Sequence, residues 1–171
     1  IMIRKPKAGE YNEFYSTYIN KIEEDNLIKL LRAQLTSFSG FMSDISEEKS
    51  DYRYAAGKWS IKEVLNHIND TERIFAYRAL CIARGEKQAL PGMDQDEYQA
   101  ASPTTTRSFS SLIEEFVAIR TSTLFLFDDM PESDSLKVGT ASDHPVSVRA
   151  LAGMIYGHCA HHTDVLKERY L

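Results

Sequence analysis

Three of the five histidines in this sequence fall within five consecutive positions of the stretch GHCAHHTDVLKERYL. His158 and His162 are four residues apart, so in a helix their imidazoles lie one turn apart on one face and can reach a single metal ion. His161 is turned about 100° from His162 and points toward a flank of that face. Two alternatives stay open for the pair: metal ligation, or a role as buried histidines that hydrogen-bond to their neighbours.

A third histidine, His67 in KEVLNHINDTER, strengthens the metal hypothesis. On its own helix it lies beside Val64 and Thr71, at the edge of the apolar arc, from which it can point inward. A helical bundle brings facing helices together, and three histidines with an open coordination position form a known type of catalytic metal site. We therefore predict His67, His158 and His162 as metal ligands.

Carboxylates near His67 are candidates to orient it, because a ligating histidine usually donates its second N–H to a carboxylate or a carbonyl. Glu63 and Asp70 stand about one turn before and after His67, within reach by spacing. A solvated helix face is the alternative for both, and Glu63 also fits a capping box with Ser60 at the start of the helix. Trp59, next to that cap, is expected to be a structural anchor.

Other reactive side chains are expected to lie away from the metal. Cys159 is turned about 100° from the adjacent histidine and is predicted to be a buried thiol. Cys81 stands about 21 Å along its helix from the first histidine of the site. For Tyr77 and Arg78, contact with a substrate and a surface or packing role stay open. His144, in the loop ASDHPVS, is interpreted as solvated.

Four long segments with helical periodicity must position these residues. They span about 27–44, 61–84 and 108–129, and a last one begins after DHPVS and continues nearly to Leu171. In the first segment, apolar residues recur at alternating steps of three and four, which marks one buried face. A shorter helix is expected over about 10–22. Almost nothing alternates with the period of two that strands show, so the predicted fold class is all-α.

The connection between the second and third long helices is unusually long. It reads GEKQALPGMDQDEYQAASPTTTR, whereas antiparallel neighbours in a simple bundle are joined by short loops. This length predicts a crossover, with the second and third long helices running parallel. A short helical turn is expected around MDQDEYQAA.

Composition and charge limit the class of protein. The chain has 171 residues, 43% hydrophobic and 26% charged, which is enough to bury one core, and we expect a single domain over residues 1–171. The formal net charge of -5 leaves no general basic surface for phosphate contacts, which argues against nucleic-acid binding. No run approaches the length of a membrane span. Two cysteines and the lack of an apolar leader core in IMIRKPKAGEYNEF indicate a cytoplasmic protein.

Three stretches of the sequence resemble the DinB-like superfamily, close to its YfiT-like branch: YRYAAGKWSIKEVLNHINDTERIFAYRALCIARGE, LPGMDQDEY and PVSVRALAGMIYGHCAHHTDVLKERYL. The most specific parts are GKWSIKEVLNHINDTE, which contains His67, and the terminal GHxxHH, which contains His158 and His162. The resemblance covers nearly the whole chain and implies a four-helix bundle with up-down-down-up topology. It also implies that these three histidines are the metal ligands.

The same resemblance implies a divalent transition metal, nickel or zinc among others, and a small-molecule substrate. It implies two candidate activities: metal-dependent hydrolysis, and transfer of a low-molecular-weight thiol such as bacillithiol, mycothiol or glutathione onto an electrophile. In either case the metal favours the deprotonated form of a water or a thiol. A metal-bound binding or stress-response protein without turnover is the first alternative, and a purely structural bundle is the second. The oligomeric state stays open, with a homodimer among the choices.

Overall fold

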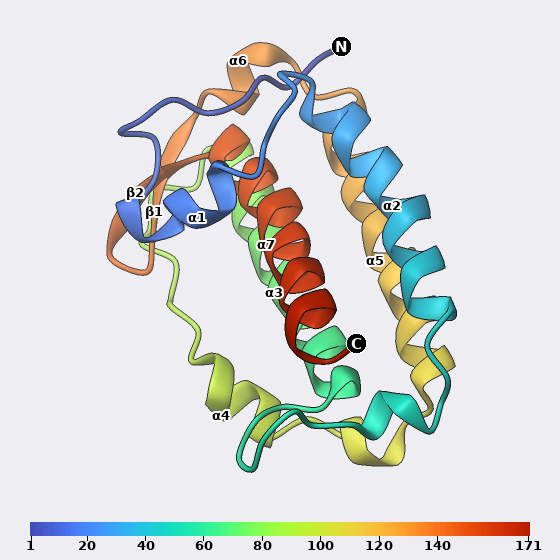
Figure 1. The fold of residues 1–171 in the computed structure, drawn as a ribbon. Helices are drawn as coiled ribbons and strands as arrows, with labels where there is room; N and C mark the ends of the chain where they lie inside the picture. Colours follow the sequence, from blue (N-terminus) through green and yellow to red (C-terminus); the bar gives the residue numbers. More distant parts are fainter.

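The computed structural model describes residues 1–171, and four long helices form its body (Figure 1). They are α2 (Leu27–Ser43), α3 (Ile61–Ala83), α5 (Phe109–Asp128) and α7 (Val148–Arg169), with ends close to those predicted. Each helix begins directly after a side chain that accepts a hydrogen bond from the backbone N–H three residues on, which satisfies a donor that has no partner inside the helix. These caps are Asn26, Ser60, Ser108 and Ser147. None of the helices combines the length and the apolar character needed to cross a membrane.

Helices α3 and α5 run parallel, as the long connection between them predicts. Residue numbers rise along both helices from one contact to the next, as expected for parallel helices. Asn69 donates to the Leu112 carbonyl (3.1 Å), and Glu72 pairs with Arg120 (2.8 Å). The connection returns along the outside of the bundle, so that α5 starts at the same end as α3 (Figure 1). It contains the short helix α4 (Gln95–Ala100), where a helical turn is predicted, and a 3₁₀ turn at Thr104–Thr106.

The other helix pairs in contact give the rest of the topology. Contacts between α3 and α7, and between α2 and α5, advance in opposite directions along the two helices, so each of these pairs is antiparallel. The contacting residues are Trp59 with Tyr170 and His67 with His158 for the first pair, and Arg32 with Asp128 and Phe38 with Phe116 for the second. The bundle therefore has the predicted up-down-down-up arrangement, with a 3₁₀ turn (Lys49–Asp51) between α2 and α3.

The helix predicted over 10–22 is much shorter in the structure. Only a 3₁₀ turn (Glu13–Tyr15) and α1 (Ser16–Ile19) form there, where the chain passes across α7 (Figure 1). The approach is so close that a Cβ at Gly157 would stand 2.1 Å from the Tyr18 carbonyl oxygen. Because the segment crosses α7 instead of packing along it, only about one turn of helix has a surface to bury. Local periodicity does not reveal such a tertiary contact.

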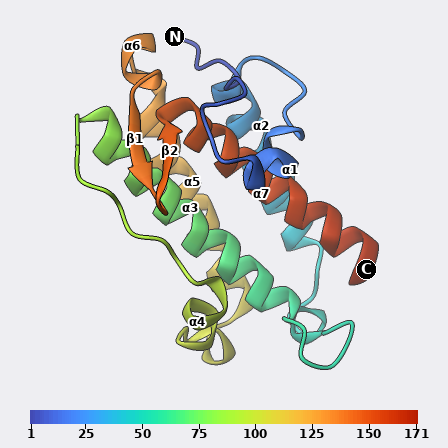
Figure 2. The ribbon, with the colours of Figure 1, turned by 90° about the vertical axis from the view of Figure 1, so that its left-hand side faces the viewer.

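An antiparallel hairpin that the periodicity does not predict precedes α7. Its strands are β1 (Val138–Ala141) and β2 (His144–Ser147), and the short helix α6 (Glu132–Ser135) connects it to α5. The two-residue turn holds Ser142 and Asp143 at positive φ (50° and 64°), a geometry that more often uses Asn-Gly or glycine. Strands of four residues are too short for alternation to stand out. The hairpin lies over one end of α3 (Figure 2), and the fold class remains all-α.

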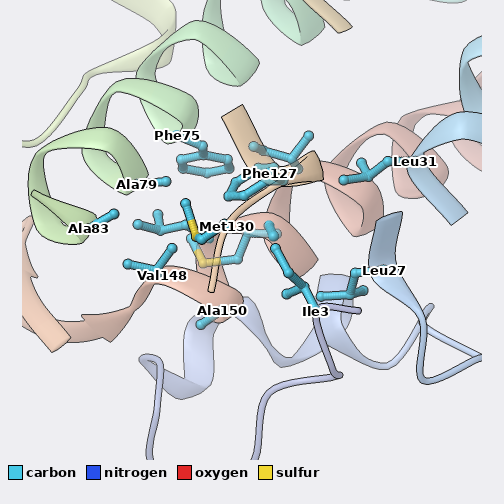
Figure 3. Packing of buried hydrophobic residues seen from close by; sticks show 14 of the residues in the cluster. Ile3, Leu27, Leu31, Phe75, Ala79, Ala83, Phe127, Met130, Val148 and Ala150 are labelled. Carbon is cyan, nitrogen blue, oxygen red and sulfur yellow. The ribbon is translucent and has the colours of Figure 1, made fainter. Parts of the chain in front are cut away.

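The core consists of two apolar clusters, one toward each end of the bundle. The larger has 21 buried residues, among them Phe75 and Phe127 (Figure 3), and it includes Ala141 and Val146 of the hairpin. The smaller has 13, among them Phe38 and Phe116. Both clusters draw on all four long helices, which explains why these helices pack as one body.

A buried polar layer separates the two clusters. It contains one residue from each long helix: Gln34, Glu72, Arg120 and His158. Arg120 is fully buried, donates to both carboxylate oxygens of Glu72 at 2.8 and 2.9 Å, and donates to Gln34 Oε1 at 2.9 Å. The histidines of the predicted metal site thus begin at the middle of the bundle, beside a layer whose charges are paired.

Candidate metal centre

The three predicted ligand histidines come from two antiparallel neighbours, α3 and α7. His67 lies about two turns into α3, whose start is set by a capping box between Ser60 and Glu63. His158 and His162 lie one turn apart on the side of α7 that faces α3. Local helix signals orient each imidazole, and the packing of α3 against α7 brings all three together.

The Nε2 atoms of these histidines converge. The Nε2 atom of His158 lies 2.9 Å from Nε2 of His67 and 3.1 Å from Nε2 of His162. Ligand atoms of all three residues lie within 4.8 Å of one another. Imidazole nitrogens bound at about 2.0–2.1 Å to one metal ion stand roughly 3 Å apart when they are adjacent. The donor type and the spacing therefore fit a small divalent cation.

Burial keeps these histidines neutral. His67 and His158 are each 4% exposed, and His162, at the edge of the cluster, is partly exposed. Loss of hydration lowers the pKa of His67 to about 4 and the pKa of His162 to about 3. Burial, followed by the neighbouring histidines, holds the pKa of His158 well below its ordinary value. A neutral imidazole has a lone pair on one ring nitrogen, which metal ligation requires.

The two carboxylates predicted to orient His67 contact other groups instead. Glu63 completes the capping box and pairs with Arg53, and Asp70 accepts a long hydrogen bond from Asn66 (3.4 Å). Neither carboxylate forms a hydrogen bond with His67. For Glu63 the reason is competition, because the unpaired N–H groups at the start of a helix and a nearby guanidinium attract a carboxylate at that position.

Other side chains contact the histidine rings. The Thr71 hydroxyl lies 3.4 Å from Nδ1 of His67, and the ring of Trp59 packs 4.9 Å from the His67 ring, centre to centre. Tyr18 packs edge-on against His158, with 5.3 Å between ring centres. The spacing of four residues from His67 is a signal that points to Thr71. No local signal points to Tyr18, since only the crossing of α1 over α7 brings it there.

The remaining histidines lie outside the cluster. The ring of His161 packs 5.5 Å from that of Tyr18 and 5.1 Å from that of His162, and its nitrogens do not join the converging group. The helical wheel thus separates the two adjacent histidines as the structure does. His144 is exposed as predicted, although it begins β2 and does not lie in a loop.

Neither cysteine belongs to the histidine cluster. Cys159 is 1% exposed, which makes it the buried thiol that the sequence predicts, and burial raises its pKa to about 12. Cys81 lies in the last turn of α3, far from the histidines, and both thiols are free.

A cavity of about 310 Å³ opens beside the histidine cluster. Its wall includes His67 and His158, aromatic residues of the α1 region, one face of α3 and the residues at the start of α4. Of the two α3 residues left open by the sequence, Arg78 lines this cavity, whereas Tyr77 is 59% exposed on a different face. The cavity provides room for a small molecule next to the converging nitrogens.

Comparisons with known proteins agree with this architecture. A family model described as the DinB superfamily matches residues 30–166. No curated protein matches the chain. Among solved structures, YfiT from Bacillus subtilis, described as "a probable metal-dependent hydrolase with an unusual four-helix bundle topology", is similar with a TM-score of 0.71 and 14% sequence identity, over 95% of this chain and 91% of that chain. At this identity the likeness establishes the fold, and it confirms the predicted bundle.

Proposed function

The chain belongs to the DinB superfamily, and we propose that it is a metal-dependent enzyme whose divalent ion is bound by His67, His158 and His162. The observation that carries the proposal is the convergence of three Nε2 atoms beside a cavity. Each ring brings only its Nε2 atom to this point, and in a neutral imidazole that atom carries either a proton or a lone pair, so one ring's N–H cannot satisfy the lone pairs of the other two. One shared cation satisfies the three lone pairs together.

The donor set determines what chemistry such a site supports. A bound divalent ion polarises an electrophile and favours the deprotonated form of a water or a thiol, which supplies a nucleophile near neutral pH. Three protein ligands leave at least one coordination position free for a small-molecule substrate or a water. Imidazole nitrogens suit several transition metals, and zinc or nickel is the ion we propose.

Neighbouring side chains orient the ligands and exclude water. The Thr71 hydroxyl oxygen lies against Nδ1 of His67, so it can accept a hydrogen bond from the Nδ1–H of this ring while Nε2 ligates. The rings of Trp59 and Tyr18 pack on His67 and His158 and cover them from bulk solvent. Exclusion of water strengthens the electrostatic interactions inside the site.

Hydrolysis of a small-molecule ester or amide is the activity that we propose first. Support comes from the shared fold with YfiT, which is itself described as a probable metal-dependent hydrolase. Transfer of a low-molecular-weight thiol to an electrophile would use the same ion and the same cavity. It is the second outcome that the activity assay must distinguish.

The metal content of matched histidine variants tests the assignment of ligands. His67→Ala, His158→Ala and His162→Ala should each lose stoichiometric metal, with zinc or nickel affinity lowered more than about 100-fold. His161→Ala is the control and should keep the metal, because its ring lies outside the converging group. Elemental analysis measures the bound ion, and calorimetric titration of each folded variant measures affinity. Parental affinity in His162→Ala with lost affinity in His161→Ala would overturn the assignment.

Activity assays of the metal-loaded protein then separate the reaction classes. A hydrolase turns over members of an ester and amide panel without added thiol, whereas a transferase requires a thiol and consumes it together with an electrophile. Stoichiometric metal without turnover in either assay would contradict the enzyme proposal and favour a metal-bound protein that only binds its ligand.

A further inference from the structure

Arg78 is the only buried cationic side chain without a carboxylate partner. The buried cations are Lys62, Arg78, Arg120 and Arg149. The partners of the other three are Glu47 and Asp51 for Lys62, Glu72 for Arg120, and Glu10 for Arg149. Arg78 is 4% exposed, and its guanidinium donates to two neutral acceptors, the Pro91 carbonyl at 2.8 Å and the Ser142 hydroxyl at 3.3 Å.

An uncompensated buried charge is unfavourable, because neutral acceptors replace only part of the hydration that a guanidinium loses. Burial lowers the pKa of Arg78, whereas the pKa of its paired counterpart Arg120 is raised. A well-packed apolar side chain would avoid this penalty. An anion from outside the protein that pairs with the guanidinium would compensate this buried charge.

The position of Arg78 on α3 links it to the metal site. It follows His67 by 11 residues, which is about three turns, so both side chains lie on one face of the helix. Thr71 and Ile74 lie between them on this face, and all four residues line the same cavity. About 16 Å of helix axis separates Arg78 from His67, and long helical side chains lean toward the N-terminus, which here is the direction of the histidines. Arg78 and the histidines that line this cavity, His67 and His158, therefore share one wall, with the positions of Arg78 and His67 separated by about three helical turns.

We infer that Arg78 binds a carboxylate of the substrate while the reacting group lies at the histidine cluster. This inference rests on the proposed metal-dependent function and adds the substrate class to it. A guanidinium offers a carboxylate two parallel N–H···O bonds, which fix its orientation as well as its position. The substrate is then a small molecule whose carboxylate stands several bonds away from the carbon that reacts.

The rest of the cavity agrees with a monoanion of this kind. Ile74 and Phe75 provide an apolar wall between the two ends, which suits an alkyl or aromatic spacer. Asp94 and Asp96 line the cavity too, and their negative charge disfavours a phosphate dianion relative to a single carboxylate. Arg78 is thus a substrate-binding residue that selects the substrate by charge.

Binding of three matched probes to the full chain tests the inference without relying on turnover. Sodium hexanoate, hexanamide and hexyl phosphate each have an unbranched chain of six carbons and differ in charge. Calorimetry is done on the protein as purified and after chelator treatment, so that coordination of hexanoate to a metal is separated from binding to Arg78. In the chelator-treated protein, hexanoate should bind at least ten-fold more tightly than hexanamide and more tightly than hexyl phosphate.

Variants locate the selectivity. Arg78→Met should lower hexanoate affinity to the level of hexanamide, whereas Arg84→Met, at an exposed arginine that ends the same helix outside the cavity, should keep the parental affinity. Asp96→Asn, at an exposed position, should tighten hexanoate binding several-fold, and it keeps the inference testable if Arg78→Met does not fold. Unchanged hexanoate affinity in folded Arg78→Met, weaker binding in Asp96→Asn, or a preference for hexanamide or hexyl phosphate would each overturn the inference.

The same measurements separate failure of this inference from failure of the proposed function. His162→Ala should lose metal and still bind hexanoate with the affinity of the chelator-treated parent, because Arg78 lines the cavity and His162 does not. Hexanoate selectivity in a parental protein that binds no zinc or nickel would refute the metal proposal and leave the carboxylate site in place. Stoichiometric metal without hexanoate selectivity would refute only the role of Arg78.

Discussion

Arg120→Met should lower the free energy of unfolding by about 4 to 6 kcal/mol, because it leaves a buried carboxylate without a counter-ion. Arg120 is fully buried and Glu72 is 3% exposed, and two hydrogen bonds of 2.8 and 2.9 Å join them. Removal of one partner of such a pair costs about 3 to 5 kcal/mol. Arg120 also donates to Gln34 Oε1 at 2.9 Å, and the buried acceptor left behind adds at least about 1 kcal/mol.

Equilibrium unfolding in urea, followed by circular dichroism, measures this loss by linear extrapolation. In a thermal scan the midpoint should fall by roughly 10 to 20 °C for a chain of this size. Arg32→Met is the matched control: its ion pair with Asp128 is solvent-exposed on the arginine side, so the change should stay within about 1 kcal/mol. The double variant Glu72→Leu/Arg120→Met should recover most of the loss, since it removes both buried charges.

Two results would refute this reasoning. A loss in Arg120→Met no larger than in Arg32→Met would mean that the polar layer is hydrated and that its charges need no protein partner. A double variant as unstable as Arg120→Met would mean that side-chain packing, not the unpaired charge of Glu72, is responsible.

Three further predictions concern the histidines, the α1 crossing and the thiols. Chelator-treated protein should lose stability below about pH 6.5, because the unfolded chain binds protons at its histidines there while burial holds the pKa of His67 at about 4. This residue alone should lower the free energy of unfolding by about 2 kcal/mol at about pH 5 relative to neutral pH. Equal urea midpoints at pH 7 and pH 5 would contradict this prediction. Gly157→Ala should destabilise by about 1 to 3 kcal/mol, as its Cβ would stand 2.1 Å from a backbone carbonyl of α1. Gly40→Ala, with open space around it, should stabilise by up to about 1 kcal/mol, and thermal unfolding that ranks the two glycine variants alike would count against the crossing. An aromatic disulfide reagent should label Cys81 in the native protein and Cys159 only after unfolding, so two fast thiols would be inconsistent with burial of Cys159.

Local signals in the sequence were sufficient for the four long helices and for the direction of their side chains. Caps such as Ser60 and Ser147 and apolar steps of three and four act within one or two turns, so they can be read without knowing what the helix packs against. The same local geometry distinguishes His162 from His161, because a rotation of about 100° per residue is a property of any α-helix. The long crossover allows α3 and α5 to run parallel, since a short loop cannot return the chain to the starting end of α3.

Only the tertiary structure decided which groups meet across the bundle. The placement of Tyr18 on His158 depends on α1 crossing α7 at Gly157, a contact between segments far apart in the sequence. Spacing put Glu63 within reach of His67, yet the carboxylate is bound by the helix start and by Arg53. Competition of this kind depends on every group within a few ångströms of the carboxylate, and the spacing of residues along the sequence does not reveal the groups that other segments contribute.

Arg78 shows the same division most clearly. Its residue type and its place on the face of α3 that carries His67 can be read from the sequence. These two features do not decide whether Arg78 contacts a substrate or has a surface or packing role. That it is buried, that each other buried cation has a carboxylate partner, and that it shares a cavity with the histidines follow only from the folded chain. The physical reason is that burial and charge pairing are set by the long-range packing of several elements, whereas the sequence by itself determines each element and the face on which its side chains stand.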